Sequence, residues 1–262
     1  WRGAAKPPWK RSIVSLSSPD ITIALLPGRA VLRMGGRLLE QGSGEGWEGA
    51  LAALNLLLVQ AQPNGTAHII LSHHFSGVML LPPPPVRLSN AEMDGWVAGC
   101  LTESYGAEAA AWRPVWQDVP PGRAVPVAVM EGARFDRLAL RMKESGLTLG
   151  LVEPWFCSAW DRQRRALANR SGWLALLEPG RICLSRIEKG RPVILRVAQA
   201  GDTPMADLAA MVARESLHAS VTIQGDIWLA AAGVEVPSTG SVAGCILHAL
   251  LPAGANGSSL LP

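Results

Sequence analysis

The fold of this chain is decided by the stretch Leu25-Leu-Pro-Gly-Arg-Ala-Val-Leu32 and by its counterpart Leu176-Leu-Glu-Pro-Gly-Arg-Ile-Cys-Leu184. In each stretch an apolar run is followed by Pro-Gly and then by a second apolar run. Pro-Gly between two apolar runs is typical of a turn that joins two antiparallel strands. We therefore predict a β-hairpin in each half of the chain.

The residues that follow each hairpin continue the likeness between the two halves. A third strand, a helix and a further strand are predicted in both, and the last of these contains His68 in the first half and Val221 in the second. His68 follows Gly28 by 40 residues, and Val221 follows Gly180 by 41. Two unrelated meanders are the alternative, but matching order together with matching length favours an internal repeat. The repeated unit is β-β-β-α-β.

The composition describes a folded chain with a large core. Hydrophobic residues make up 48% of the 262 residues, charged residues 17%, and the mean hydropathy is +0.19. These values exclude a disordered chain and a disulfide-stapled miniprotein. A net charge of +3 without a basic stripe predicts no nucleic-acid partner. The chain contains no apolar run of about 18 residues, so we predict no membrane span within it.

Four segments are expected along the chain. The basic, proline-rich start predicts a mobile arm over 1–11. The first lobe is predicted over 12–150, with an insertion at about 86–130. The second lobe is predicted over 151–236, and the Gly-, Ser- and Pro-rich end over 237–262 predicts a loosely packed tail.

A duplicated β-β-β-α-β unit resembles the actin-like ATPase superfamily, an α/β fold with two ribonuclease-H-like lobes. In active members of that superfamily, the first hairpin of each lobe holds phosphate with an Asp-x-Gly loop. The corresponding turns here contain Pro27 and Gly28, and Glu178, Pro179 and Gly180. Proline has no N–H to offer a phosphate, and neither turn has the aspartate. We therefore expect no cofactor, no metal and no catalysis, with Glu178 as the one residue that could serve an atypical phosphate site.

A more specific resemblance lies in His68-Ile-Ile-Leu-Ser-His-His-Phe-Ser-Gly-Val-Met-Leu-Leu-Pro82 and in the order of elements up to Ala232. This stretch is similar to the cytoplasmic domains of GspL proteins of type II secretion and to PilM proteins of type IV pili. The resemblance implies a cytoplasmic scaffold, peripheral to the inner membrane. Its implied partners are a bitopic membrane protein of the PilN or GspM kind and the assembly ATPase, and a homodimer stays open.

Several residues could bind a partner or a ligand. Arg162, Arg164 and Arg165 are predicted in one helical stretch, as a solvated face or as a patch for an acidic partner. Trp112 and Trp116 share one face of a predicted strand, either as core residues or as interface anchors.

Other motifs carry weaker signals. Gly44–Gly49 matches G-x-G-x-x-G, but the next strand lacks the acidic end of a dinucleotide site, so a loop leading into a helix is favoured. His73 and His74 are adjacent and predict no metal site. Cys157 is predicted to be a buried thiol rather than a reactive one.

The leading hypothesis is therefore a non-catalytic scaffold of a type IV pilus or type II secretion platform. The alternative is an actin-like ATPase with an atypical phosphate site at Glu178. A sugar- or acyl-transfer enzyme of another α/β fold would need a convergent acid–base set, which the sequence does not show at a recognisable spacing.

Overall fold

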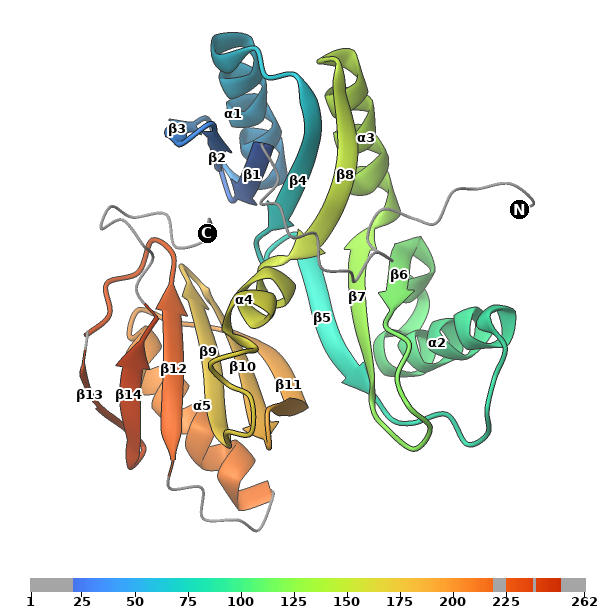
Figure 1. Ribbon diagram of the computed structural model, residues 1–262, viewed down its shortest axis with the longest axis vertical. Coiled ribbons are helices and arrows are strands. Elements are labelled where there is room, and N and C mark those ends of the chain that lie inside the picture. Colours follow the sequence, from blue (N-terminus) through green and yellow to red (C-terminus); the bar gives the residue numbers. More distant parts are fainter. Residues whose placement is uncertain (1–20, 219–224, 238, 251–262) are drawn as a thin grey trace. The chain divides into compact units, whose positions relative to one another are not determined.

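The computed structural model describes residues 21–218, 225–237 and 239–250, and it divides after Pro154 into two compact units (Figure 1). The predicted arm over 1–11 lies outside the described residues. The division follows the strand Leu147–Pro154, whose last residues lie beyond the predicted boundary at 150. Each unit contains a mixed sheet that begins with an antiparallel meander, and the first unit has a smaller sheet as well.

The sheet of the first unit has the strand order β3-β2-β1-β4-β8. Strands β1 to β3 pair antiparallel, whereas β4 runs parallel to β1 and β8 runs parallel to β4. The predicted meander is confirmed, with Pro27-Gly28 and Gly35-Gly36 at its two turns. The strands are β1 (Ile21–Leu26), β2 (Arg29–Met34), β3 (Arg37–Gly42), β4 (Gly65–Leu71) and β8 (Leu147–Pro154).

Two helices cover one face of this sheet, α1 (Gly46–Ala61) and α3 (Gly132–Glu144), as Figure 1 shows. Strand side chains alternate between faces, so Ile23 and Leu25 both point toward the helices. They share one buried core with Leu54 of α1 and Leu138 of α3, all fully buried. Burial of such side chains stabilises the fold by about 1.5–3 kcal/mol each.

A smaller, three-stranded sheet in the order β5-β7-β6 belongs to the same unit. Helix α2 covers one face of it and begins with a capping box, in which Ser89 and Glu92 exchange hydrogen bonds. The insertion predicted to start at about 86 begins earlier, because β5 belongs to this sheet. The elements are β5 (Ser76–Leu81), α2 (Asn90–Tyr105), a 3-10 helix (Gly106–Ala111), β6 (Trp112–Trp116) and β7 (Val125–Glu131).

The second unit repeats the first. Its sheet has the order β11-β10-β9-β12-β14-β13, so an antiparallel meander is again followed by two parallel strands, β12 and β14. Helix α5 packs on β9, β10 and β12 as α1 does in the first unit. The elements are α4 (Trp155–Gln163), β9 (Gly172–Glu178), β10 (Arg181–Glu188), β11 (Arg191–Gln199), α5 (Pro204–His218), β12 (Asp226–Ala231), β13 (Thr239–Val242) and β14 (Cys245–Ala249).

Two sequence predictions concern the end of the second unit, and the second of them needs correction. The strand predicted at Val221 lies outside the described residues, and the strand that pairs parallel with β9 is β12. The prediction of a loosely packed tail from 237 is wrong for 239–249. There β13 and β14 form a hairpin that joins the sheet and buries Val242, Cys245 and Leu247. Residues 251–262 lie outside the described part of the chain.

Candidate functional site

The first hairpin turn, Pro27-Gly28, is where an actin-like lobe would hold phosphate, and its backbone donors are missing or engaged. Gly28 has a φ of +67°, which a type II turn requires at its second central residue. The N–H of Gly28 donates to the carbonyl of Gly46 at 2.9 Å, and its carbonyl accepts from the N–H of Ser43 at 2.8 Å. Pro27 has no N–H. Neither central residue of this turn therefore has an unpaired N–H for an anion.

Gly49, the last glycine of the 44–49 motif, serves close packing around that same turn. A Cβ on Gly28 would overlap the carbonyl oxygen of Gly44, and one on Gly49 would overlap that of Ser43 and lie 2.9 Å from the Cα of Gly28. Gly49 thus lets the first turn of α1 lie directly against the hairpin. The predicted role of the motif as a loop leading into a helix is confirmed, and its last glycine is needed for backbone contact.

The second hairpin turn, Pro179-Gly180, places Glu178 in the interior. Only 1% of the surface of Glu178 is exposed. The carbonyl of Gly180 accepts a hydrogen bond from the N–H of Ala200 at 3.0 Å. A carboxylate that is to hold the water shell of a metal must face a solvated cleft, and Glu178 is instead buried.

The buried Cys183 thiol near Glu178 has a pKa that favours its protonated form. Burial raises the pKa of the Cys183 thiol well above its usual range, and the nearby Glu178 carboxylate and Cys157 raise it further. A reactive cysteine needs a lowered pKa and access to solvent. All four cysteines are free thiols, with Cys183 and Cys245 buried and Cys100 and Cys157 half-buried.

The two adjacent histidines lie in the turn between β4 and β5 rather than in a strand. His73 is 6% exposed, and His74 is half-buried. Within the described ranges there is no group of three or more His, Cys, Asp or Glu side chains that could hold a metal ion.

The arginine patch is not helical throughout, so this prediction is wrong in part. Helix α4 ends at Gln163, and only Arg162 lies in it. Arg164 and Arg165 lie in the turns that follow, and both are exposed. These turns are held against the β10–β11 hairpin, where the N–H of Gly190 donates to the carbonyl of Arg170 at 2.7 Å.

Trp112 and Trp116 share one face of β6 as predicted, and that face packs against α2. The indole Nε1 of Trp116 donates to Asp94 at 2.7 Å, and the ring of Trp112 lies 5.0 Å from that of Tyr105. Both tryptophans are half-buried. Their packing explains their presence, and their role as interface anchors stays a prediction.

The two edges of the small sheet differ in the backbone groups that they offer. The N–H of Gln117 donates to Pro126 of β7, so alternate residues of β6 point their N–H and C=O toward β7. Pro114 then faces outward, where it removes a donor from the free edge. On β5 the same alternation turns the backbone groups of Val78 and Leu80 away from β7. The β5 edge was not predicted, although a proline inside the predicted β6 strand was a signal that β6 is an edge.

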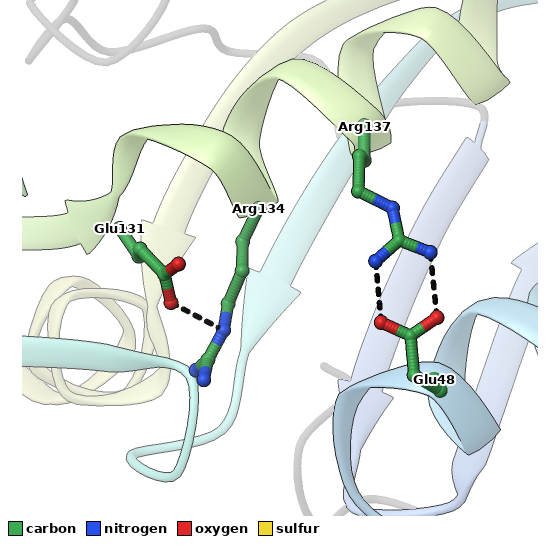
Figure 2. A network of polar contacts seen from close by, with 4 residues as sticks. All are labelled: Glu48, Glu131, Arg134 and Arg137. Carbon is green, nitrogen blue, oxygen red and sulfur yellow. Dashed lines mark hydrogen bonds and ion pairs between the residues drawn. The ribbon is translucent and has the colours of Figure 1, made fainter. Parts of the chain in front are cut away.

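An exposed ion-pair network joins helices α1 and α3 of the first unit (Figure 2). The guanidinium of Arg137 on α3 donates to both oxygens of the Glu48 carboxylate of α1 from its two terminal nitrogens, Nη1 and Nη2. The Nη2 hydrogen bond measures 2.5 Å. Beside it, Arg134 pairs with Glu131 at 2.8 Å. The hydrogen bonds from Arg137 lower the pKa of Glu48. The Arg137–Glu48 pair links the second turn of α3 to the first turn of α1.

Across the described segments, no helix is both long enough and apolar enough to cross a bilayer. No protein-family model matches the chain, and no curated protein sequence matches it.

Solved structures do match the chain, and they define its fold class. A protein of Bacteroides thetaiotaomicron, described as having an actin-like ATPase fold and unknown function, is 10% identical with a TM-score of 0.54, over 83% of either chain. The chain thus has an actin-like ATPase fold, and the predicted fold class is confirmed.

Two further structures with this fold are those that the sequence resemblance indicated. One is the PilM–PilN type IV pilus biogenesis complex, with 11% identity, a TM-score of 0.61, and coverage of 82% of this chain and 81% of that chain. The other is the cytoplasmic domain of EpsL, an inner-membrane component of the type II secretion system of Vibrio cholerae. It is 11% identical with a TM-score of 0.53, covering 83% of this chain and 84% of that chain. The resemblance to PilM and to a GspL-type cytoplasmic domain is confirmed at the level of the fold.

Proposed function

We propose that this chain is a non-catalytic scaffold of a type IV pilus or type II secretion assembly platform at the cytoplasmic face of the inner membrane. Its partners would be a bitopic membrane protein of the PilN or GspM kind and the assembly ATPase. The likeness to PilM and to the EpsL cytoplasmic domain supports the setting.

The non-catalytic part of the proposal is carried by one observation, the engaged turn at Gly28. Its N–H is bonded to Gly46, and the preceding residue is Pro27. A nucleotide phosphate at this turn would have to displace that hydrogen bond without gaining the amide cradle that phosphate loops provide. The fold would then serve to present surfaces rather than to hold nucleotide.

For the membrane partner, we propose that an extended N-terminal segment adds to the free edge of β5. Backbone hydrogen bonds to Val78 and Leu80 would give affinity, and the side chains beside them would give specificity. The opposite edge of the small sheet carries Pro114 and is poorly suited to a continuous ladder.

The experiment that tests the scaffold proposal is a pair of calorimetric titrations into the purified chain. One uses ATP with Mg²⁺, and the other uses a synthetic peptide of the cytoplasmic N-terminus of the PilN-like protein from the same organism, with a scrambled peptide as control. We expect binding of the native peptide alone. ATP binding with a Kd near 1 μM, about −8 kcal/mol, would overturn the non-catalytic assignment.

The competing ATPase hypothesis is decided by Glu178→Gln in the same titration. An atypical site at Glu178 requires that this variant lose Mg²⁺-dependent nucleotide binding. If the wild-type chain binds ATP and the variant does not, the hypothesis stands. Hydrolysis of ATP by the wild-type chain, abolished in the variant, would make it an enzyme.

A further inference from the structure

The segment from α4 to the start of β11 concentrates the positive charge of the chain. Residues 161–191 contain eight Arg and Lys side chains and three Asp and Glu side chains, whereas the rest of the chain contains sixteen and eighteen. Of the three carboxylates, Glu178 is buried and Glu188 pairs with Arg186 at 2.8 Å. This segment therefore produces a local positive field that the overall net charge of +3 does not indicate.

Two parts of this segment are held together at one end of the second sheet, the turns after α4 and the turn between β10 and β11. The N–H of Gly190 donates to the carbonyl of Arg170 at 2.7 Å, and the N–H of Lys189 donates to Oγ of Ser171 at 3.1 Å. The two backbones lie so close that a Cβ on Gly190 would be 2.8 Å from the backbone N of Asn169. Basic residues on both parts are therefore gathered at this end of the sheet.

Five exposed side chains on these two parts form what we call the basic cluster: Arg164, Arg165, Arg170, Lys189 and Arg191. Arg170 lies 4.0 Å from Asp226, and the other four form no ion pair within the described residues. In the first unit, by contrast, five arginines are each paired with a carboxylate, namely Arg29, Arg113, Arg134, Arg137 and Arg141. The charge of the basic cluster is thus left available to a partner.

The residues around the basic cluster indicate which kind of partner it fits. Protein interfaces have an apolar or aromatic centre, and their charged residues lie at the rim. The exposed residues of 161–171 and 188–191 include no aromatic side chain and no Leu, Ile, Val or Met, because Leu167 is buried. A surface that offers only positive charge suits a surface of dispersed negative charge, such as the headgroups of anionic lipids. A guanidinium can also hold a phosphate with two parallel hydrogen bonds.

We propose that the basic cluster binds the surface of a membrane that contains anionic phospholipids, without inserting into it. The guanidinium and ammonium groups contact headgroup phosphates, and the attraction falls as salt screens the charges. The proposal goes beyond the scaffold function and does not depend on it. Vesicle binding is measured on the chain alone, so it can fail while the PilN-like peptide still binds, and the reverse.

The test is flotation of the full chain with vesicles of two compositions, phosphatidylcholine alone and phosphatidylcholine with about 30% phosphatidylglycerol. At about 50 mM salt we expect binding only to the vesicles that contain phosphatidylglycerol, and at about 500 mM salt we expect that binding to be lost. Arg164→Gln/Arg165→Gln removes two charges from the turns after α4, and Lys189→Gln/Arg191→Gln removes two from the β10–β11 turn. Each double variant should weaken vesicle binding by at least about tenfold.

The matched control is Arg37→Gln/Arg87→Gln, which removes the same charge from two exposed positions of the first unit and should leave vesicle binding unchanged. Circular dichroism establishes that each variant is folded. The proposal is overturned if the wild-type chain does not float with the anionic vesicles, if neither double variant of the basic cluster weakens binding, or if the control weakens it equally. A chain that binds a glutamate-rich peptide but no vesicle also overturns it and assigns the basic cluster to an acidic protein.

Discussion

The N–H of Gly28 and the carbonyl of Gly46 are joined by a 2.9 Å hydrogen bond that ties the first hairpin turn to the first residue of α1. In this fold the same turn is the place where a phosphate would lie. The bond therefore supports the first lobe at the same turn where the actin-like resemblance would place a phosphate.

Gly28→Ala should destabilise the chain more than an alanine at another left-handed turn glycine. Any L-residue at a positive φ costs about 1–2 kcal/mol, and at Gly28 the new Cβ would also overlap the carbonyl oxygen of Gly44. Gly36→Ala is the control, because Gly36 has a φ of +77° with nothing within 4 Å of the added Cβ. In urea denaturation, the loss in the free energy of unfolding for Gly28→Ala should exceed the loss for the control by at least about 1 kcal/mol. Equal losses would show that the turn is not packed against the 43–46 loop.

Trp116→Phe should lower stability and leave partner binding unchanged. The variant removes the 2.7 Å hydrogen bond to Asp94 and costs about 0.5–1.5 kcal/mol, because β6 then loses one of its contacts with α2. Asp94→Asn, which keeps an acceptor oxygen, should lose less. The measurements are urea denaturation and the peptide titration. A weaker peptide affinity with full stability would show that Trp116 is an interface anchor after all.

The pairing of Glu48 with Arg137 should make stability depend on pH in a defined direction. The folded-state pKa of Glu48 is lowered by its hydrogen bonds to Arg137, so the pair stabilises the fold above the unfolded-state pKa of the carboxyl, about 4. That stabilisation is lost as the pH falls through the lower folded-state pKa.

Arg137→Gln should therefore lower the Tm near neutral pH and have little effect at acid pH. Arg141→Gln is the control, because the ion pair of Arg141 with Glu144 lies within α3. The measurement is Tm across the acid range by circular dichroism. A deficit of Arg137→Gln that persists unchanged in acid would mean that Arg137 acts through packing rather than through the ion pair.

How far the sequence predicts this molecule depends on whether local signals agree with tertiary contacts. The meander around Pro27-Gly28 and the capping box at Ser89 were predictable, because turn and cap chemistry is local. The hairpin of β13 and β14 was missed because Thr, Gly and Ser fill the first three of the four positions of β13 and give it little strand signal. Its only signal is the alternation of Cys245 and Leu247, which becomes decisive only when β12 is present to pair with β14.

The candidate site likewise has features that the sequence alone reveals and features that only the folded structure reveals. Loss of the Asp-x-Gly pattern is visible in the sequence, whereas the hydrogen bond from Gly28 to Gly46 and the burial of Glu178 require the fold. Arg164 and Arg165 were placed in a helix because their neighbours are good helix formers. The contact of the following residues with Gly190 ends the helix at Gln163, since a tertiary contact outweighs a weak local propensity.

The edge of β5 gives the sharpest test of how a membrane partner would bind. Val78 lies at an outward-facing position of the ladder, so Val78→Pro removes an N–H from the free edge while the hydrogen bonds between β5 and β7 stay in place. A partner strand would lose one hydrogen bond and meet the proline ring. We expect the affinity for the PilN-like peptide to fall about tenfold or more, equivalent to at least about 1.4 kcal/mol.

Pro114→Val on the opposite edge of the same sheet is the matched control and should leave that affinity unchanged. Circular dichroism and urea denaturation establish that each variant is folded before titration. If Val78→Pro binds the peptide as tightly as the wild-type chain, the partner does not add to β5; if Pro114→Val binds more tightly, the peptide uses β6 and the native proline limits its affinity.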